Sequence, residues 1–212
     1  MVLLVCVWLG QACMAADVQD AKGYQVLRTP QSRMAGGNVE VIEFFSYTCP
    51  ICFSYEPAVS DWLSRTYDRI SFRRVPVGLR PDWVPAQKMY FALELMGKAD
   101  VMHKKVFNAI HIEKRSIKSD EAVIELIAFL GLNRKRFSET YYSQDVQEKV
   151  HQALQMQKAY EVEQVPMVAV DGRFLTSPAI AAAMAGNDKP LSELQAISFN
   201  IVDDLILQSQ GK

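Results

Sequence analysis

The sequence predicts an α/β fold that is interrupted by a helical insertion, and three observations support this prediction. Residues 39–77 have the pattern of a strand, a helix and a second strand. Residues 81–142 contain successive helical stretches and no strand signal. A short apolar strand and a hairpin pattern return at residues 167–175. One α/β domain that encloses a helical segment accounts for all three.

Length and composition agree with a single domain that carries an insertion. The chain has 212 residues, 50% of them hydrophobic, and a formal net charge of −1 at pH 7. A chain of this length can bury a sizeable core. Its balanced charge gives no indication of nucleic-acid binding or of attraction to an anionic membrane surface.

The N-terminal segment differs from the rest of the chain. Residues 1–10 are almost wholly apolar, and small residues follow, among them Ala15 and Ala16. The pattern predicts a signal peptide over residues 1–16, although the first basic residue is Lys22 and a basic leader is missing. The apolar stretch is shorter than the roughly 20 residues that span a bilayer. The alternative is a buried N-terminal strand.

A strand–helix–strand unit is the clearest local pattern. The run Val39–Phe45 is nearly continuous in apolar, β-branched and aromatic residues, which favours a strand buried on both faces. A helix is expected to begin at Pro50 and to reach about Thr66. Residues 70–77 have the pattern of the next strand, and the spacing predicts a parallel pair. A short first strand is expected near residues 24–27.

The helical insertion is predicted over residues 80–150. Helices are expected at 85–96 and 100–110, and further helices are expected to start at Ser119, Asn133 and Ser143. Their apolar stripes indicate packing rather than a ligand site. We therefore expect residues 17–79 and 151–212 to form one domain that encloses the insertion.

The sheet is expected to resume after the insertion. Met167–Val170 is followed by Asp171–Gly172, which predicts a hairpin because Asp-Gly supplies the positive φ angles of a tight turn. Ser177 and Pro190 mark two helix starts. Apolar residues at helical spacing then predict a C-terminal helix with one buried face.

Cys49 and Cys52 remain outside the predicted signal peptide, and they form a C-x-x-C motif where a helix begins. The N–H groups and the dipole of a helix N-terminus stabilise an anion such as the Cys49 thiolate. A disulfide across so short a loop removes little chain entropy, which argues against a purely structural pair. Half of a zinc site is the other alternative, but no second C-x-x-C and no H-x-x-x-H spacing is present. A catalytic redox pair without a metal is therefore predicted.

One stretch and two distant positions carry a resemblance to a known family. The run from Glu43 to Cys52, Glu-Phe-Phe-Ser-Tyr-Thr-Cys-Pro-Ile-Cys, is followed by Glu56 and, far downstream, by Val165–Pro166. This pattern resembles the DsbA-type thiol–disulfide oxidoreductases. The resemblance implies a thioredoxin fold with an inserted α-helical domain, and a location in the bacterial periplasm. One departure is Ile51, where many members carry His.

The resemblance also implies a role for each cysteine and for Glu43. Cys49 is expected to form the mixed disulfide with substrate, and Cys52 is expected to resolve it or to form the partner sulfur. Glu43 is expected beneath Cys52, with a pKa raised by burial, where it relays protons. The alternative for Glu43 is an edge residue that faces water. Its counter-charge is expected from the next strand, where Arg74 and Arg73 are equal candidates.

Other positions are expected to bind substrate or to tune the redox pair. By the resemblance, Pro166 is a cis-proline that faces the cysteines, and the Val165 backbone offers hydrogen bonds to an extended peptide. Without the resemblance, Val165–Pro166 would indicate an ordinary strand entry, and Glu56 would be interpreted as a solvated surface residue. The expected redox-tuning residues are Pro50, Ile51, Glu56 and Arg74.

The predicted function is therefore a periplasmic thiol–disulfide oxidoreductase that donates its Cys49–Cys52 disulfide to exported proteins with free cysteines. It is expected to be a monomer without a cofactor or nucleic-acid partner, and the resemblance implies that a quinone-linked membrane oxidase of the DsbB type reoxidises it. One alternative is a reductase or isomerase on the same fold. Such isomerases carry an N-terminal dimerisation module, for which residues 16–39 leave no room. The other is a non-enzymatic, membrane-anchored binding module, against which the C-x-x-C motif and Pro166 argue.

Overall fold

The structure is a computed structural model, and it describes residues 22–32 and 37–211. The predicted signal peptide, residues 1–16, lies outside the described residues. The elements follow in the order β1 (Gln25–Val26), β2 (Val39–Phe45), α1 (Pro50–Thr66), β3 (Ile70–Pro76), α2 (Val84–Leu95), α3 (Ala99–His111), α4 (Asp120–Phe129), α5 (Arg134–Tyr141), α6 (Gln144–Ala159), β4 (Met167–Val170), β5 (Phe174–Thr176), α7 (Pro178–Ala185) and α8 (Leu191–Gln210).

A mixed sheet with the strand order β1-β5-β4-β2-β3 forms the centre of the molecule. β2 and β3 pair in parallel, as their spacing predicts, whereas β4 pairs antiparallel with β2 and with β5. The predicted turn between β4 and β5 is present, with φ angles of 59° at Asp171 and 63° at Gly172. Any side chain at Gly172 would also collide with the backbone oxygen of Gln31, because an added Cβ would lie 2.5 Å from it.

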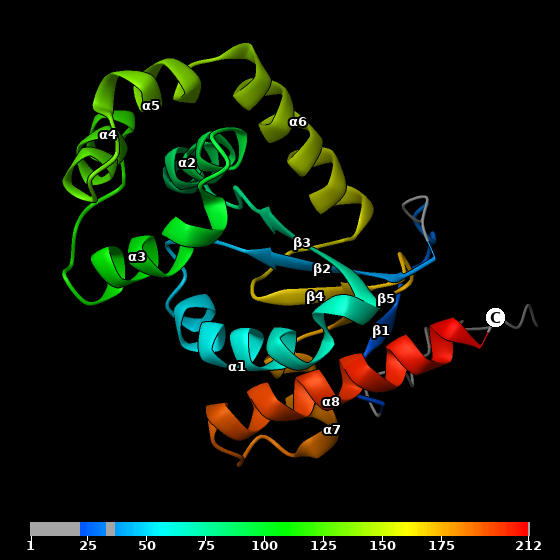
Figure 1. Cartoon of the computed structure of the whole chain (residues 1–212). Coiled ribbons are helices and arrows are strands. Elements are labelled where there is room, and N and C mark those ends of the chain that lie inside the picture. Colours follow the sequence, from blue (N-terminus) through cyan, green and yellow to red (C-terminus); the bar gives the residue numbers. More distant parts are fainter. Residues whose placement is uncertain (1–21, 33–36, 212) are drawn as a thin grey trace, which may run out of the picture.

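Helices cover both faces of this sheet (Figure 1). α1, α7 and α8 lie on one face, α6 runs over the other, and α2–α5 lie beyond one end of the sheet. Side chains alternate along β2 accordingly: Val41 packs in a core with Trp62 and Phe199, and Ile42 packs in a second core that reaches Phe107. Every residue of β2 is buried, which confirms the expected two-sided burial.

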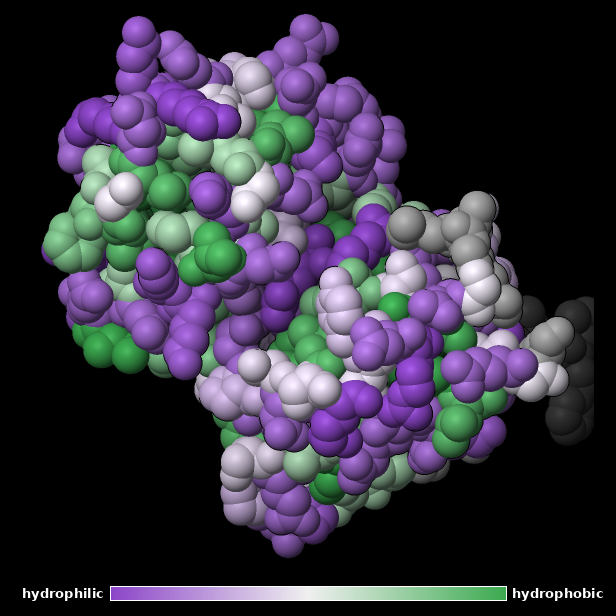
Figure 2. Space-filling model, in the orientation of Figure 1, coloured by the Kyte–Doolittle hydropathy of each residue, from purple (hydrophilic) through white to green (hydrophobic). Residues whose placement is uncertain are grey.

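The insertion helices begin where the sequence predicts. Ser119 accepts a hydrogen bond from the backbone N–H of Ala122 at 3.2 Å, and Asn133 and Ser143 act in the same way at the starts of α5 and α6. The insertion and the α1, α7 and α8 side form two lobes with an indentation between them (Figure 2). The predicted limit at residue 150 falls inside the continuous helix α6, and the domain limits stay a prediction.

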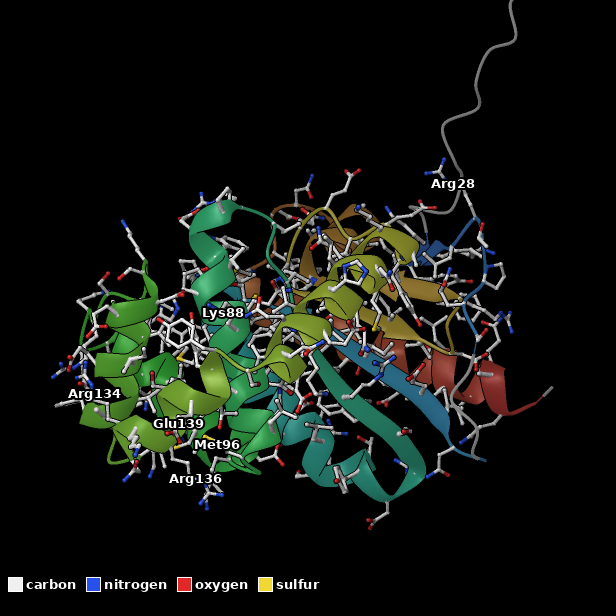
Figure 3. The ribbon with its side chains drawn as sticks, turned by 90° about the horizontal axis from the view of Figure 1, so that it is seen from above. Arg28, Lys88, Met96, Arg134, Arg136 and Glu139 are labelled. Carbon is white, nitrogen blue, oxygen red and sulfur yellow. The ribbon has the colours of Figure 1, made fainter. Side chains whose placement is uncertain are left out.

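Lys88 illustrates how the insertion is held together. Its Nζ atom lies 2.8 Å from Asp120 and 4.1 Å from the centre of the Tyr141 ring, so α2, α4 and α5 meet around one buried cation. Figure 3 shows Lys88 among these helices and Arg134 at their outer edge. Among the described residues, no helix combines the length and the apolar character needed to cross a membrane.

Candidate active site

Cys49 occupies the N-cap of α1. Its extended backbone (φ −85°, ψ 116°) ends the connection from β2, and Pro50 takes the first helical position, where a missing N–H has no consequence. The Cys49 Sγ accepts a hydrogen bond from the backbone N–H of Cys52 at 3.3 Å. Both cysteines are buried and unlinked, so the structure holds the dithiol form.

The pKa values of the two thiols are shifted in opposite directions. Hydrogen bonding from the Cys52 thiol lowers the pKa of Cys49 to about 7, against burial, and the backbone N–H groups of Cys52 and Ile51 act in the same direction. Burial raises the pKa of Cys52 well above its ordinary value, and the charge of Glu43 adds to this effect. At neutral pH, Cys49 therefore supplies a thiolate while Cys52 stays protonated.

The cis-proline expected from the resemblance is confirmed, since the Val165–Pro166 peptide bond is cis. It directly precedes β4, which pairs with β2 and so brings this loop beside the start of α1. The Cys49 thiol donates to the Val165 carbonyl oxygen at 3.5 Å. The Val165 backbone, 116 residues away in sequence, therefore contacts the first cysteine.

Glu43 lies in the interior and not at a water-facing edge. Its side chain is 1% exposed, and the Arg74 Nε donates to its Oε2 at 2.9 Å. Its Oε1 has no hydrogen-bond partner among the described residues. Burial raises the pKa of Glu43 to about 7, because the opposing charge of Arg74 only partly offsets the loss of hydration.

The register of β2 and β3 decides between the two candidate arginines. Glu43 pairs with Arg74 across the parallel ladder, which puts both side chains on the α1 face of the sheet. Arg73 points to the opposite face, where its Nε donates to Glu40 at 2.9 Å. Adjacent arginines thus serve different carboxylates, and Arg74 is the counter-charge of Glu43.

Glu56 is not a solvated surface residue. Its side chain, 18% exposed, lies 3.6 Å from the Arg74 Nη2 through Oε2 and 2.9 Å from the His103 Nε2 through Oε1. Burial raises the pKa of Glu56, but the hydrogen bond from His103 and the charge of Arg74 outweigh it, and the pKa is lowered overall. Glu56 and Glu43 therefore share one guanidinium.

The sequence analysis did not identify the part of the site that comes from α3. The His103 Nδ1 lies 2.9 Å from the Tyr47 hydroxyl, and the His111 Nε2 donates to the Tyr47 backbone oxygen at 2.8 Å. His111 also stacks on Phe53, with ring centres 4.8 Å apart. The signal was present, since residues eight positions apart in a helix share a face. α3 therefore holds Tyr47, two residues before Cys49, at both its hydroxyl and its carbonyl.

Ile51 lies in the first turn of α1, beside Cys49, and the residue is 42% exposed. Pro50 is exposed as well. The surface around the reactive thiol is thus apolar on the α1 side, and no imidazole stands between the cysteines.

Comparison with known proteins gives one consistent result. A family model described as a DSBA-like thioredoxin domain matches residues 63–191. A thiol:disulfide interchange protein DsbA from Burkholderia cepacia is 36% identical over 187 residues, which are 88% of each chain. The DsbA from Bordetella parapertussis is 35% identical over 196 residues, covering 92% of this chain and 88% of the relative.

A solved structure agrees with these sequence matches. The crystal structure of Pseudomonas aeruginosa DsbA superimposes with a TM-score of 0.79 and 27% identity, covering 90% of this chain and 93% of that one. The expected thioredoxin fold with an inserted helical domain is thereby confirmed. The family model begins after the C-x-x-C motif, whereas a match over 187 of the 212 residues necessarily includes both cysteines.

Proposed function

This chain belongs to the DsbA family of thiol–disulfide oxidoreductases, and on that premise we propose that it oxidises cysteine pairs of newly exported proteins with its Cys49–Cys52 disulfide. The observation that carries the proposal is the position of Cys49 at the N-cap of α1, where its sulfur accepts a backbone hydrogen bond. Stabilising this thiolate stabilises the dithiol form, and the corresponding disulfide becomes a better electron acceptor.

Oxidation of a substrate proceeds in two exchange steps. A substrate thiolate attacks the Cys49 sulfur, the Cys49–Cys52 bond breaks, and Cys52 leaves with the electron pair and takes up a proton. A second substrate thiolate then attacks the substrate sulfur of the mixed disulfide, and Cys49 leaves as a thiolate. The substrate has lost two electrons and gained a disulfide, and the enzyme holds the dithiol.

The two pKa values suit these roles. Cys49, with its pKa of about 7, is a good leaving group in the second step. Cys52 has a raised pKa and needs a proton when it leaves in the first step. Glu43, with a pKa of about 7, can give that proton near neutral pH and can take it back when the pair is reoxidised.

The loop before β4 and the residues around the cysteines complete the proposal. The Val165 backbone would hydrogen-bond an extended substrate, and Pro166 presents it to Cys49, so recognition would depend little on substrate side chains. Pro50, Ile51, Glu56 and Arg74 would set the redox poise, the first two at the helix start and the last two through Glu43.

The proposed setting is the periplasm, where disulfides persist in exported proteins. A quinone-linked membrane oxidase of the DsbB type would return the dithiol to the disulfide, and the enzyme would act as a monomer without a cofactor. The signal peptide over residues 1–16 and the insertion over residues 80–150 belong to the same proposal.

Trapping with cysteine variants tests the division of labour. Cys52→Ala removes the thiol that can attack the Cys49 sulfur of a mixed disulfide and release the substrate, so this variant should accumulate covalent adducts with exported proteins through Cys49. Cys49→Ala is the matched control, because it keeps the Cys52 thiol. It should accumulate no adducts. Adducts are counted on non-reducing gels after acid quenching and alkylation. Equal adduct yields from the two variants, or adducts through Cys52 alone, would contradict the assignment.

A further inference from the structure

His103 is a buried histidine that the exchange mechanism above does not use. It lies on α3, its side chain is 6% exposed, and both ring nitrogens have partners. Nδ1 lies 2.9 Å from the Tyr47 hydroxyl, and Nε2 lies 2.9 Å from Glu56 Oε1. The imidazole therefore connects the insertion to the helix that carries the cysteines.

The contacts continue from Glu56 to Glu43. Glu56 Oε2 lies 3.6 Å from the Arg74 Nη2, and the Arg74 Nε donates to Glu43 Oε2 at 2.9 Å. The four charged or titratable side chains are each less than one fifth exposed. His103 thus stands at one end of a continuous polar chain, and Glu43 stands at the other.

The chemistry of the partners fixes the proton positions in this chain. An ionised Glu56 can only accept, so the His103 Nε2 carries the hydrogen, and Nδ1 then accepts from the Tyr47 hydroxyl. Burial lowers the pKa of His103, which keeps the ring neutral at neutral pH. One neutral tautomer satisfies both contacts.

The open end of the chain is accessible to water. A groove of about 800 Å³ between α1 and α3 is lined by Glu56, Arg74 and His103, with Phe53 and Phe107 among its apolar residues. Glu56 is therefore in contact with the groove, while Glu43 is enclosed at the far end of the chain.

We propose that His103 is a positioning residue for thiol exchange, which holds Glu56 ionised against Arg74 and thereby sets the pH at which Glu43 releases its proton. The inference rests on the proposed role of Glu43. Glu56 and Glu43 compete for Arg74, so an anionic Glu56 makes ionisation of Glu43 harder. The other titratable groups that act on Glu43, Glu56 or His103 are Cys52, Tyr47, Tyr55, Tyr90 and Asp100, and the variants below replace none of them.

Loss of the His103 donor has a defined consequence. Without it Glu56 binds a proton more readily, so its negative charge offsets Arg74 less. Arg74 then attracts the Glu43 carboxylate with less competition, so Glu43 ionises at a lower pH. The expected shift of the Glu43 titration is roughly one pH unit downward.

The test compares His103→Leu with His103→Gln, whose amide nitrogen can donate to Glu56 from nearly the position of Nε2. The pH dependence of dithiol oxidation is measured by stopped flow, and Glu43 is titrated directly by carboxyl ¹³C NMR, with Glu43→Gln to assign its signal. His103→Leu should move both midpoints downward, and His103→Gln should restore them. His151→Leu, at an exposed site on α6, is the matched control and should change neither.

Two outcomes would overturn the inference. One is a His103→Leu variant that slows exchange by the same factor at every pH and leaves the Glu43 titration in place. The other is a Glu56→Gln variant whose Glu43 midpoint stays at the wild-type pH, and this single variant decides the matter even where His103→Leu does not fold. Where His103→Leu does fold, adding it to Glu56→Gln should cause no further shift. A wild type that oxidises no dithiol would refute the proposed function, and the NMR titration would still decide on His103.

Discussion

At the scale of single residues, Ile51 stands between the two cysteines, at a position where the family resemblance leads us to expect His. The backbone N–H of Ile51 helps to lower the pKa of Cys49, but an isoleucine side chain can offer the thiolate neither a charge nor a hydrogen bond. A charge-assisted hydrogen bond contributes about 1.5–3 kcal/mol, which equals about one to two pKa units. We expect Ile51→His to lower the pKa of Cys49 by that amount.

The same substitution should change the redox poise in a predictable direction. A more stable thiolate favours the dithiol, so Ile51→His should raise the reduction potential by about 30–60 mV under mildly alkaline conditions. Thiolate absorbance measures the pKa, and equilibration with glutathione measures the potential. Ile51→Leu is the control and should change neither. A potential that stays constant while the pKa falls would separate the two quantities and contradict the argument.

At the scale of elements, features that depend on local signals could be predicted from the sequence, and features that depend on strand register could not. The two-sided burial of β2 and the starts of α4, α5 and α6 follow from local signals, an apolar run and capping side chains. Which of Arg73 and Arg74 pairs with Glu43 depends on the register of β2 and β3, because the side chains of successive strand residues point to opposite faces of the sheet.

The part of the site that comes from α3 could not be predicted, because it depends on contacts between segments that are distant in the sequence. His103 and Tyr47 are 56 residues apart, and they meet only because the insertion packs back on the active-site turn. The C-x-x-C pair was predicted from its own spacing and its place at a helix start, whereas the cis-proline was predicted because a family resemblance marks Val165–Pro166. The resemblance pointed to no residue of α3, and the apolar stripe of this helix indicated only packing.

The register leads to a prediction at the same scale. Arg74→Leu removes the cation next to Glu43, so the pKa of Glu43 should rise above its present value of about 7. The midpoint of the pH profile for dithiol oxidation should move upward by roughly one unit or more. Arg73→Leu is the matched control, because Arg73 pairs with Glu40 on the other face. Equal shifts from the two variants would contradict the assignment of faces.

At the scale of the whole molecule, the site lies where the two lobes meet, and its buried charge should be visible in folding stability. The folded chain raises the pKa of Glu43 from 4.5 to about 7. Between these pH values the folded state keeps a proton that the unfolded chain has released. The contribution of this proton to stability is therefore complete below about pH 4.5 and is lost as the pH rises through 7.

The predicted effect can be isolated by a difference measurement. A shift of this size corresponds to at most about 3 kcal/mol, at 1.36 kcal/mol per unit. His103 and His111 act in the opposite sense, since burial lowers their pKa values and the unfolded chain then binds more protons near pH 6. The free energy of unfolding is measured in urea for the oxidised wild type and for Glu43→Gln, at about pH 5 and pH 8. The difference between the two proteins at each pH removes the contribution of the histidines, which both share. The stability of the wild type relative to Glu43→Gln should fall by up to that amount between the two pH values, and a constant difference would mean that Glu43 does not hold its proton in the folded state.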